Sequence, residues 1–362
     1  MGLDFADRIG RIPVYPAADG YALSESVALL ASNEAPFAPL PEVVAAAAEA
    51  ARTAHRYPDP GASRLRAALA QRTGVPVDQI ATGNGSCDIL LALGDALLQP
   101  GRELVYAWPA FSMYPQLGAT AGATDVQVPL DAEDRHDLKA LAAAVTPQTR
   151  LLLICNPNNP TSTLVPLEEI EELLQAVGDS VCVVLDEAYR EFVTSEEPDA
   201  SLELLARYPN LVILRTFSKV YGLAALRVGY GLCGDSSIRT AVDQVRQPFF
   251  CNASAQAAAI EALAHGDEVD RRVALMVEER ERLAAGLAAL GCQVAQSQAN
   301  FLWVKLPAGV DEKEIVGGLS DRDILVRAGT ALGGVGHLRV TVGLPDQHER
   351  LLAALAELLA QR

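Results

Sequence analysis

Short apolar runs alternate with helical patterns through most of the chain between about residues 41 and 250. The runs are continuous in leucine and β-branched residues, which predicts strands that are covered on both faces. Alternation of helix and strand in this way is typical of an α/β fold with a mostly parallel sheet sandwiched by helices. We expect helices at 43–52, 64–71 and 88–98, and strands at 80–82, 103–107, 150–155, 181–185, 211–216 and 228–232.

The pattern changes after about residue 265. It predicts a long helix at 269–290, strand-like segments within 293–306, 324–326 and 337–343, and a closing helix at 347–360. Residues 1–40 are too irregular to fold alone. The chain is therefore expected to have a large α/β domain of residues 41–265, and a small α+β domain of residues 1–40 and 266–362.

The composition excludes several classes of function. A formal net charge of −17 argues against nucleic acid or an anionic membrane as a partner, because both require a basic face. No apolar stretch approaches the roughly 20 residues that cross a bilayer, and the first residues do not form a basic and then apolar leader. The cysteines form no CxxC pair and the five histidines are dispersed, so we expect a reduced, cytoplasmic protein without a metal site.

Polar residues of complementary types follow the predicted strands. Gly83-Asn84-Gly85-Ser86 opens a helix, which suits a phosphate group, while Asp186 and Tyr189 follow a later strand. Ligands of open α/β sheets bind beyond the carboxyl ends of the strands, where these residues would meet. Each motif alone could be a turn or a helix cap. Together they predict a crevice that holds a phosphate cradle, a carboxylate, a phenol and an amine.

The amine of that crevice would be Lys219, which follows the apolar run 211–214. The chain has four lysines, and Lys139 and Lys313 lie in charged, solvated stretches, while Lys305 ends a predicted strand. An ammonium group at the end of a buried strand is costly unless it is paired or used in chemistry. Lys219 is therefore the candidate for a Schiff base. A lysine, a carboxylate, a phenol and a phosphate cradle are the groups that pyridoxal phosphate requires.

The chain resembles the fold-type-I, class-II pyridoxal-phosphate-dependent aminotransferases, and within them the histidinol-phosphate aminotransferase family. The resembling segments occur in order over nearly the whole chain, and the run from Arg215 to Leu223 is the most specific of them. They are Ser32-Asn33-Glu34, Arg56-Tyr57-Pro58-Asp59, Gly83-Asn84-Gly85-Ser86, 155–161, Asp186-Glu187-Ala188-Tyr189, 215–230, Gln298-Ala299-Asn300-Phe301, Val326-Arg327 and Leu338-Arg339-Val340-Thr341.

The resemblance implies a role for residues around the cofactor ring in the large domain. Lys219 would form the imine with the cofactor and carry the proton during catalysis. Asp186 would pair with the pyridine nitrogen, and Tyr189 and Asn159 would bond the ring hydroxyl. Phe111 would stack on the ring face. The cofactor phosphate would be held by Ser86, Cys87, Thr216, Ser218 and Arg227.

The resemblance also implies an assembly and a substrate site. Tyr57 would reach the phosphate from the neighbouring subunit, so the protein is expected to be a homodimer with shared active sites. Arg339 would bind a substrate carboxylate through a bidentate pair. Arg327, Tyr15 and Asn159 would help to shape the same substrate pocket.

The sequence departs from the family pattern at two informative places. Ser162 stands where the family usually has glycine after Asn159-Pro160-Thr161, and serine lacks the φ freedom of glycine. Together with 297–303, which ends in Trp303, this substitution resembles a subgroup that acts on aromatic amino acids. Cys87 replaces a common acidic residue, which leaves a backbone contact possible but removes a charged side chain.

Three functions remain open from the sequence. The favoured one is transamination between L-histidinol phosphate and 2-oxoglutarate, which gives imidazole-acetol phosphate and L-glutamate in histidine biosynthesis. The alternative is an aromatic amino acid (phenylalanine) aminotransferase, as the Ser162 and Trp303 segments suggest. A more remote alternative is a lyase similar to phosphothreonine decarboxylase, which shares the scaffold. In the first two cases the partners are a small amino donor and a 2-oxo acid.

Overall fold

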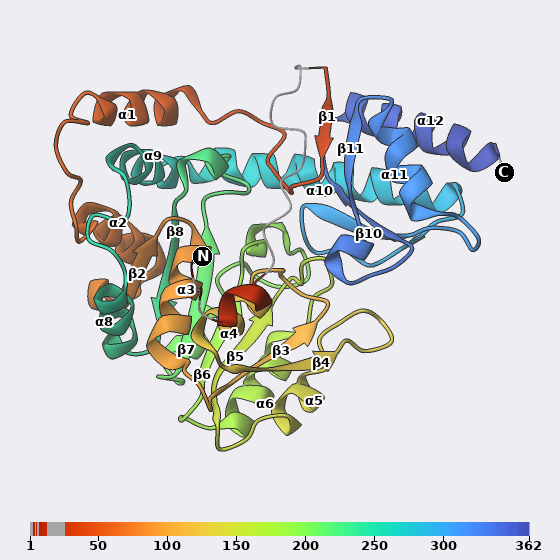
Figure 1. The fold of residues 1–362 in the computed structure, drawn as a ribbon. Coiled ribbons are helices and arrows are strands. Elements are labelled where there is room, and N and C mark those ends of the chain that lie inside the picture. Colours follow the sequence, from red (N-terminus) through yellow and green to blue (C-terminus); the bar gives the residue numbers. More distant parts are fainter. Residues whose placement is uncertain (1–2, 4, 6, 13–25, 362) are drawn as a thin grey trace.

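The computed structural model describes residues 3, 5, 7–12 and 26–361, and these contain two β-sheets (Figure 1). The larger sheet has seven strands in the order β2-β8-β7-β6-β5-β3-β4. All of its pairings are parallel except those of β8, which runs antiparallel to β2 and β7. The expectation of an α/β fold with a mostly parallel sheet is confirmed.

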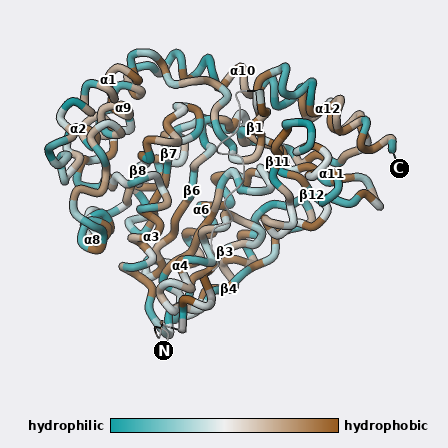
Figure 2. Tube along the Cα trace, turned by 45° about the horizontal axis from the view of Figure 1, so that its top comes forward, coloured by the Kyte–Doolittle hydropathy of each residue, from teal (hydrophilic) through white to brown (hydrophobic). Residues whose placement is uncertain are grey.

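The strands of the larger sheet form where the apolar runs predicted them. Successive residues point to opposite faces of a strand, so Val183 and Leu185 enter one hydrophobic core while Val184 enters another. Figure 2 shows hydrophobic segments concentrated in these inner strands. The strands are β2 (Ile80–Gly83), β3 (Glu103–Trp108), β4 (Thr124–Pro129), β5 (Thr149–Cys155), β6 (Cys182–Asp186), β7 (Leu211–Thr216) and β8 (Gly229–Cys233).

Helices cover both faces of this sheet. One core receives α1 (Pro41–Ala51), α2 (Ser63–Thr73), α5 (Leu138–Ala143), α6 (Leu167–Val177) and α9 (Ala253–Leu263). The core on the opposite face receives α3 (Ser86–Leu97), α4 (Tyr114–Ala121) and α8 (Ser236–Val245). Shorter helices are η1 (Asp7–Arg11), η3 (Val77–Gln79), η4 (Arg190–Phe192), α7 (Leu202–Leu205), η5 (Ala224–Leu226) and η6 (Thr330–Leu332).

The second sheet joins the two ends of the described chain. Its order is β1-β11-β12-β10-β9, and β1 pairs in parallel with β11 while the other pairs are antiparallel. Helices α10, α11 and α12 pack a separate apolar core against it (Figure 1). The elements are β1 (Ala28–Leu30), α10 (Gly266–Ala289), β9 (Gln293–Val294), β10 (Phe301–Lys305), α11 (Glu312–Ser320), β11 (Ile324–Ala328), β12 (His337–Thr341) and α12 (Pro345–Ala360).

The two sheets contain the strands that the sequence predicted, together with β4 and β1, which it did not predict. The domain boundaries at residues 40 and 265 stay predictions. Helix α10 begins beside the large sheet and extends to the C-terminal elements (Figure 1). Within the described part of the chain, no helix combines the length and the apolar character needed to cross a membrane.

Candidate active site

A cavity of about 600 Å³ lies beyond the carboxyl ends of β5, β6 and β7 and is closed by residues of the second sheet. This is the position and the size expected of a ligand site in an open α/β sheet. Twelve of the residues singled out from the sequence line it together. They are Ser86, Cys87, Phe111, Asn159, Asp186, Tyr189, Thr216, Ser218, Lys219, Arg227, Arg327 and Arg339.

Two predicted site residues are not among those that line the cavity. The side chain of Tyr57 is 81% exposed and stacks on Phe249, with 4.4 Å between the ring centroids. Tyr15 lies outside the described residues. A contribution of Tyr57 to a site therefore requires a site other than the cavity of its own chain.

Asp186 ends β6 and is almost completely buried. Its Oδ2 accepts a hydrogen bond from the Tyr114 hydroxyl at 3.2 Å, and its Oδ1 accepts one from the Ala188 amide at 3.3 Å. Burial raises the pKa of the carboxyl group to about 6, while these two hydrogen bonds oppose the shift. The ionised form of Asp186 would therefore be stabilised by a cationic group in the cavity.

Tyr114 was not anticipated from the sequence. It lies at the start of α4, is fully buried, and packs edge-on against Phe111 with 5.8 Å between the ring centroids. One side chain thus contacts both the carboxylate and the aromatic ring that face the cavity. The only sequence signal is its spacing of three residues from Phe111.

Lys219 follows β7, and its Nζ donates a hydrogen bond to the Ser32 carbonyl at 3.2 Å. Desolvation and, to a smaller extent, the positive charge of Arg339 lower the pKa of the amine to about 8, while Glu34 opposes the shift. About a tenth of the amine is therefore neutral at pH 7, far more than for an ordinary lysine. A neutral amine is the form that attacks a carbonyl carbon.

This pKa predicts how Lys219 of the cofactor-free protein reacts with a small aldehyde. At pH 7 about a tenth of the amine is neutral, so the rate of reductive alkylation should rise nearly tenfold up to pH 9 and then level off. An ordinary lysine titrates near 10.4 and would still be gaining reactivity there. Mass spectrometry of the four lysine sites measures the rates, and a rate at Lys219 that still climbs above pH 10 would contradict the prediction.

Two amide side chains converge on the hydroxyl group of Tyr189. It accepts hydrogen bonds from Asn33 Nδ2 at 3.1 Å and from Asn159 Nδ2 at 3.4 Å. Burial raises the pKa of the phenol well above its ordinary value, so it stays protonated. With its oxygen accepting both bonds, the hydroxyl group can donate its own proton to an acceptor in the cavity.

Asn33 is a second residue whose position was not anticipated, although the Ser32-Asn33-Glu34 segment was noted. Its backbone is left-handed, with φ 54°. Its amide donates to the Thr341 hydroxyl at 2.9 Å, and its carbonyl accepts from Asn300 Nδ2 at 3.0 Å. Asn33 therefore joins Tyr189, which follows β6 of the large sheet, to Thr341 of β12 and to Asn300, which precedes β10.

Arg339 enters the cavity from β12. Its Nη1 donates to Asn159 Oδ1 at 2.7 Å and its Nη2 donates to the Ala31 carbonyl at 2.6 Å. Arg327 lies directly opposite Arg339 in the antiparallel register of β11 and β12, and both line the cavity. Two guanidinium groups on neighbouring strands make this wall suited to anions.

The opposite end of the cavity is an anion cradle at the N-terminus of α3. A Cβ on Gly85 would lie 2.8 Å from Arg227 Nη2, and a Cβ on Gly229 would lie 2.5 Å from the Ser86 amide nitrogen. Gly85 thus leaves room for the guanidinium group of Arg227, and Gly229 leaves room for the backbone of the helix terminus, where N–H groups favour an anion. Burial raises the pKa of the Cys87 thiol to about 11, so its side chain adds no charge there.

The cradle is completed by two hydroxyl groups at the end of β7. Thr216 Oγ1 donates to Ser218 Oγ at 3.0 Å, and Thr216 Oγ1 also accepts from the Ser218 amide at 3.1 Å. Both side chains are buried and both line the cavity. Hydroxyl donors beside a helix terminus and a guanidinium group are the chemistry that a phosphate requires.

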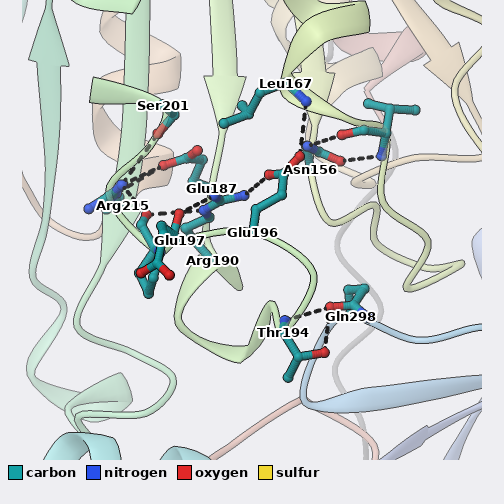
Figure 3. A network of polar contacts seen from close by, with 12 residues as sticks. Asn156, Leu167, Glu187, Arg190, Thr194, Glu196, Glu197, Ser201, Arg215 and Gln298 are labelled. Carbon is teal, nitrogen blue, oxygen red and sulfur yellow. Dashed lines mark hydrogen bonds and ion pairs between the residues drawn. The ribbon is translucent and has the colours of Figure 1, made fainter. Parts of the chain in front are cut away.

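A buried ion pair holds the ends of β6 and β7 together (Figure 3). Arg215 Nε donates to Glu187 Oε2 at 2.9 Å, and the two side chains are 7% and 1% exposed. Nη1 of Arg215 also donates to Asp199 at 2.6 Å. Glu187 directly follows Asp186, and Arg215 directly precedes Thr216, so the pair fixes the backbone that carries site residues on both strands.

We expect Glu187→Ala to lower the free energy of unfolding by about 3 kcal/mol, because Arg215 would keep a buried charge without its innermost partner. Urea unfolding followed by circular dichroism measures the change. Glu278→Ala is the matched control, since it removes an exposed partner of Arg282 and should cost less than about 1 kcal/mol. Equal losses in the two variants would contradict the structural role of the buried pair.

Ser162 ends the 156–162 turn, at the place where the family usually has glycine. Ser162 adopts a left-handed φ of 62°, and its hydroxyl donates to the Thr161 carbonyl at 2.6 Å. The Ser162 carbonyl accepts from the Gln298 amide at 2.8 Å, and Gln298 also accepts from the Thr194 amide (Figure 3). Ser162 and the 297–303 segment, which together resemble the aromatic subgroup, are therefore bonded to each other.

The described residues contain no group of three or more His, Cys, Asp or Glu side chains that could hold a metal ion. What the cavity brings together is an amine, a buried carboxylate, a protonated phenol, an anion cradle and a pair of guanidinium groups. This set can hold a phosphorylated aldehyde at one end and a carboxylic acid at the other.

Comparison with known proteins gives consistent results. The family model for aminotransferase class I and II matches residues 25–355. An aromatic amino acid aminotransferase of Thermobifida fusca is 48% identical over 90% of this chain and 88% of that protein. A protein of the same name from Streptomyces coelicolor is 41% identical over 96% of this chain and 95% of that protein.

Solved structures of aminotransferases share the fold. The histidinol-phosphate aminotransferase of Sinorhizobium meliloti, determined in complex with pyridoxal-5'-phosphate, superposes with a TM-score of 0.88 at 30% identity, covering 99% of this chain and 98% of that one. The N-succinyldiaminopimelate aminotransferase of Mycobacterium tuberculosis gives a TM-score of 0.82 at 25% identity, covering 91% and 92%.

These findings correct one expectation. The favoured reading, transamination of histidinol phosphate in histidine biosynthesis, is wrong, because relatives at 41–48% identity carry the name of the aromatic alternative. The physical reason is that the neighbouring residues Arg327 and Arg339 indicate a site for an anion but do not determine which anion binds there. A guanidinium group binds a carboxylate as well as a phosphate.

Proposed function

The chain belongs to the class I and II aminotransferase family and is an aminotransferase, and from that premise we propose that it acts on aromatic amino acids with pyridoxal phosphate as cofactor. The observation that carries the substrate class is the agreement among curated relatives that are 39–48% identical over 90–99% of this chain. The resemblance seen in the sequence is confirmed at the level of the family.

The residues present fit pyridoxal phosphate. The cradle formed by Gly85, Ser86 and Arg227 suits the phosphate, the carboxylate of Asp186 suits a protonated ring nitrogen, and the amine of Lys219 suits the aldehyde. Phe111 lines the same cavity and can cover the ring face. When bound, the cofactor supplies an aldehyde that condenses with amines and a ring that withdraws electrons.

Each catalytic side chain has a task that its surroundings support. Asp186 would hold a proton on the ring nitrogen, because its buried carboxylate gains from a neighbouring positive charge. The Tyr189 hydroxyl, which accepts a hydrogen bond from Asn159 Nδ2, would donate its own proton to the ring oxygen. The neutral Lys219 Nζ would take the proton from the substrate Cα and return it during the second half of the reaction.

We propose that Arg339 binds the α-carboxylate of both substrates through its guanidinium group, held in place by Asn159 and the Ala31 carbonyl. Arg327, opposite it on β11, would take the second carboxylate of a dicarboxylic acceptor such as 2-oxoglutarate. Tyr15 stays a candidate of the same pocket on the basis of the sequence alone.

We further propose a homodimer with shared sites. Tyr57 projects from the surface of its own chain, stacked on the partly exposed Phe249, rather than into its own cavity. In the dimer, Tyr57 of the partner subunit would reach the cofactor phosphate. The anion cradle already holds Ser86, Ser218 and Arg227 from one chain, so the added hydroxyl group would complete it.

A panel of amino donors measured on one preparation with 2-oxoglutarate tests the proposal. We expect kcat/KM for phenylalanine, tyrosine or tryptophan to exceed that for histidinol phosphate at least tenfold. A preference for histidinol phosphate would overturn the proposed substrate class. Release of carbon dioxide from the donor without any acceptor would identify the lyase alternative instead.

A further inference from the structure

The two strands that carry the cavity arginines are connected by a loop that includes residues 330–336, here called the 330–336 segment. It follows β11, which holds Arg327, and precedes β12, which holds Arg339. Its first turn is the short helix η6, and Leu332 of this turn lines the cavity. The position of the segment therefore sets part of the wall beside the anion site.

A single carboxylate fixes both ends of the 330–336 segment. Glu312, at the start of α11, is 9% exposed. Its Oε1 accepts from the Thr330 amide at 2.9 Å, and its Oε2 accepts from the Thr330 hydroxyl at 2.9 Å and the Gly336 amide at 2.7 Å. Three hydrogen bonds to one buried charged group hold the two ends of the loop at a fixed separation.

Both tryptophans of the chain hold the middle of the segment. A Cβ on Gly333, which has φ 91°, would lie 3.0 Å from Trp108 Nε1, and a Cβ on Gly334 would lie 2.3 Å from Trp303 Cζ2. Trp108 ends β3 of the large sheet and Trp303 lies in β10 of the second sheet. The loop is thus packed against an aromatic side chain from each sheet.

Leu332 is chemically distinct from the other residues around the cavity. Of the described residues that line it, Leu332 is the only aliphatic one larger than alanine. The other large side chains with apolar surface are the aromatic rings of Phe111 and Tyr189. Phe111 is assigned above to the cofactor ring and Tyr189 to its oxygen. Leu332 is therefore left as an apolar surface of the cavity, in the loop that joins the strands of Arg327 and Arg339.

We propose that Leu332 is a specificity-determining residue that packs against the aromatic side chain of the amino donor, and that Glu312 is the residue that positions it. This inference rests on the proposed function and deepens it. A donor bound through its carboxylate to Arg339 would place its ring against Leu332, whereas a dicarboxylic acceptor would direct its second carboxylate to Arg327. The two substrates would thus use neighbouring but separate parts of one wall.

The test uses the holoenzyme and two amine-free probes, 3-phenylpropanoate and glutarate, whose binding is followed by the visible absorbance of the cofactor. Leu332→Ala should weaken 3-phenylpropanoate about tenfold or more and leave glutarate within twofold, because removed apolar contacts in such a pocket have effects of this size. Leu332→Met, which conserves volume, should restore binding. Equal weakening of both probes, or no weakening of either, would overturn the proposal.

The positioning role of Glu312 has its own test. Glu312→Gln replaces an acceptor by an NH₂ group that cannot accept from the Gly336 amide, so the loop should loosen. We expect a several-fold higher KM for phenylalanine with kcat and the KM for glutamate nearly unchanged. Lys313→Gln, at the exposed neighbouring position of α11, is the matched control and should change neither. A fall in kcat for both donors would overturn the positioning role.

These results are separable from those of the proposed function. If wild-type enzyme prefers histidinol phosphate to aromatic donors, the proposed function fails before any variant is made. If wild-type enzyme prefers aromatic donors but Leu332→Ala keeps full selectivity between the two probes, only the inference about Leu332 fails.

Discussion

Lys219→Ala is expected to reduce turnover by about 10⁴-fold or more, because the variant loses both the nucleophile and the group that moves the substrate proton. The three remaining lysines, Lys139, Lys305 and Lys313, are all exposed and none lines the cavity, so none can take over. Single-turnover kinetics with phenylalanine measures the loss. The visible absorbance band of the protein-bound cofactor should vanish, and the cofactor should become removable by dialysis.

The control for this experiment is Lys313→Ala, which changes a surface lysine of α11. It should keep the absorbance band and the wild-type rate. If the Lys219 variant kept both the band and the rate, the reactive amine would have to be another residue. The assignment of the cavity as the active site would then be wrong.

Asp186→Asn is expected to keep the cofactor bound but to lower kcat by several orders of magnitude. The amide has no charge with which to hold a proton on the ring nitrogen, so the ring withdraws electrons poorly. The anion cradle and Lys219 are untouched by the change, which is why binding should persist. Measuring kcat and the cofactor dissociation constant of the variant shows whether turnover is lost while binding is kept. An unchanged kcat would contradict the role assigned to Asp186.

The same variant should stabilise the cofactor-free protein at neutral pH. Burial raises the pKa of Asp186 to about 6 from an ordinary 3.8, so the folded state binds a proton that the unfolded state has released between these values. The ionised carboxylate therefore costs stability above pH 6, by about 1–3 kcal/mol. Urea unfolding should find Asp186→Asn the more stable protein at pH 7, with a difference that shrinks as the pH falls to 4.

The sequence predicted most of the large sheet, because its inner strands are continuous apolar runs. Strand β7 was expected at 211–216, where it lies, and the other inner strands differ by one or two residues at their ends. Strand β4 (Thr124–Pro129) was missed because it lies at the edge of the sheet and is partly exposed, which gives it a mixed pattern. Strand β1 has three residues and forms only through its partner β11.

The site divides in a similar way. Lys219, Asp186 and Arg227 could be located because motifs surround them at the ends of strands. Tyr114 and Leu332 could not, since the first acts from a fully buried helix start and the second from a glycine-rich loop. Their roles arise from contacts between distant parts of the chain, which periodicity does not encode. The nature of the substrate likewise depends on the shape of the pocket rather than on the kinds of residues in it.

The pairing of β1 with β11 bears on how the protein is made. Ala28 lies opposite Ile324, and Ala31–Glu34, which follow β1, form part of the cavity wall. During synthesis the strand partner of β1 emerges from the ribosome almost 300 residues later than β1 itself. The wall formed by Ala31–Glu34 therefore follows a strand whose partner is not made until translation is nearly finished.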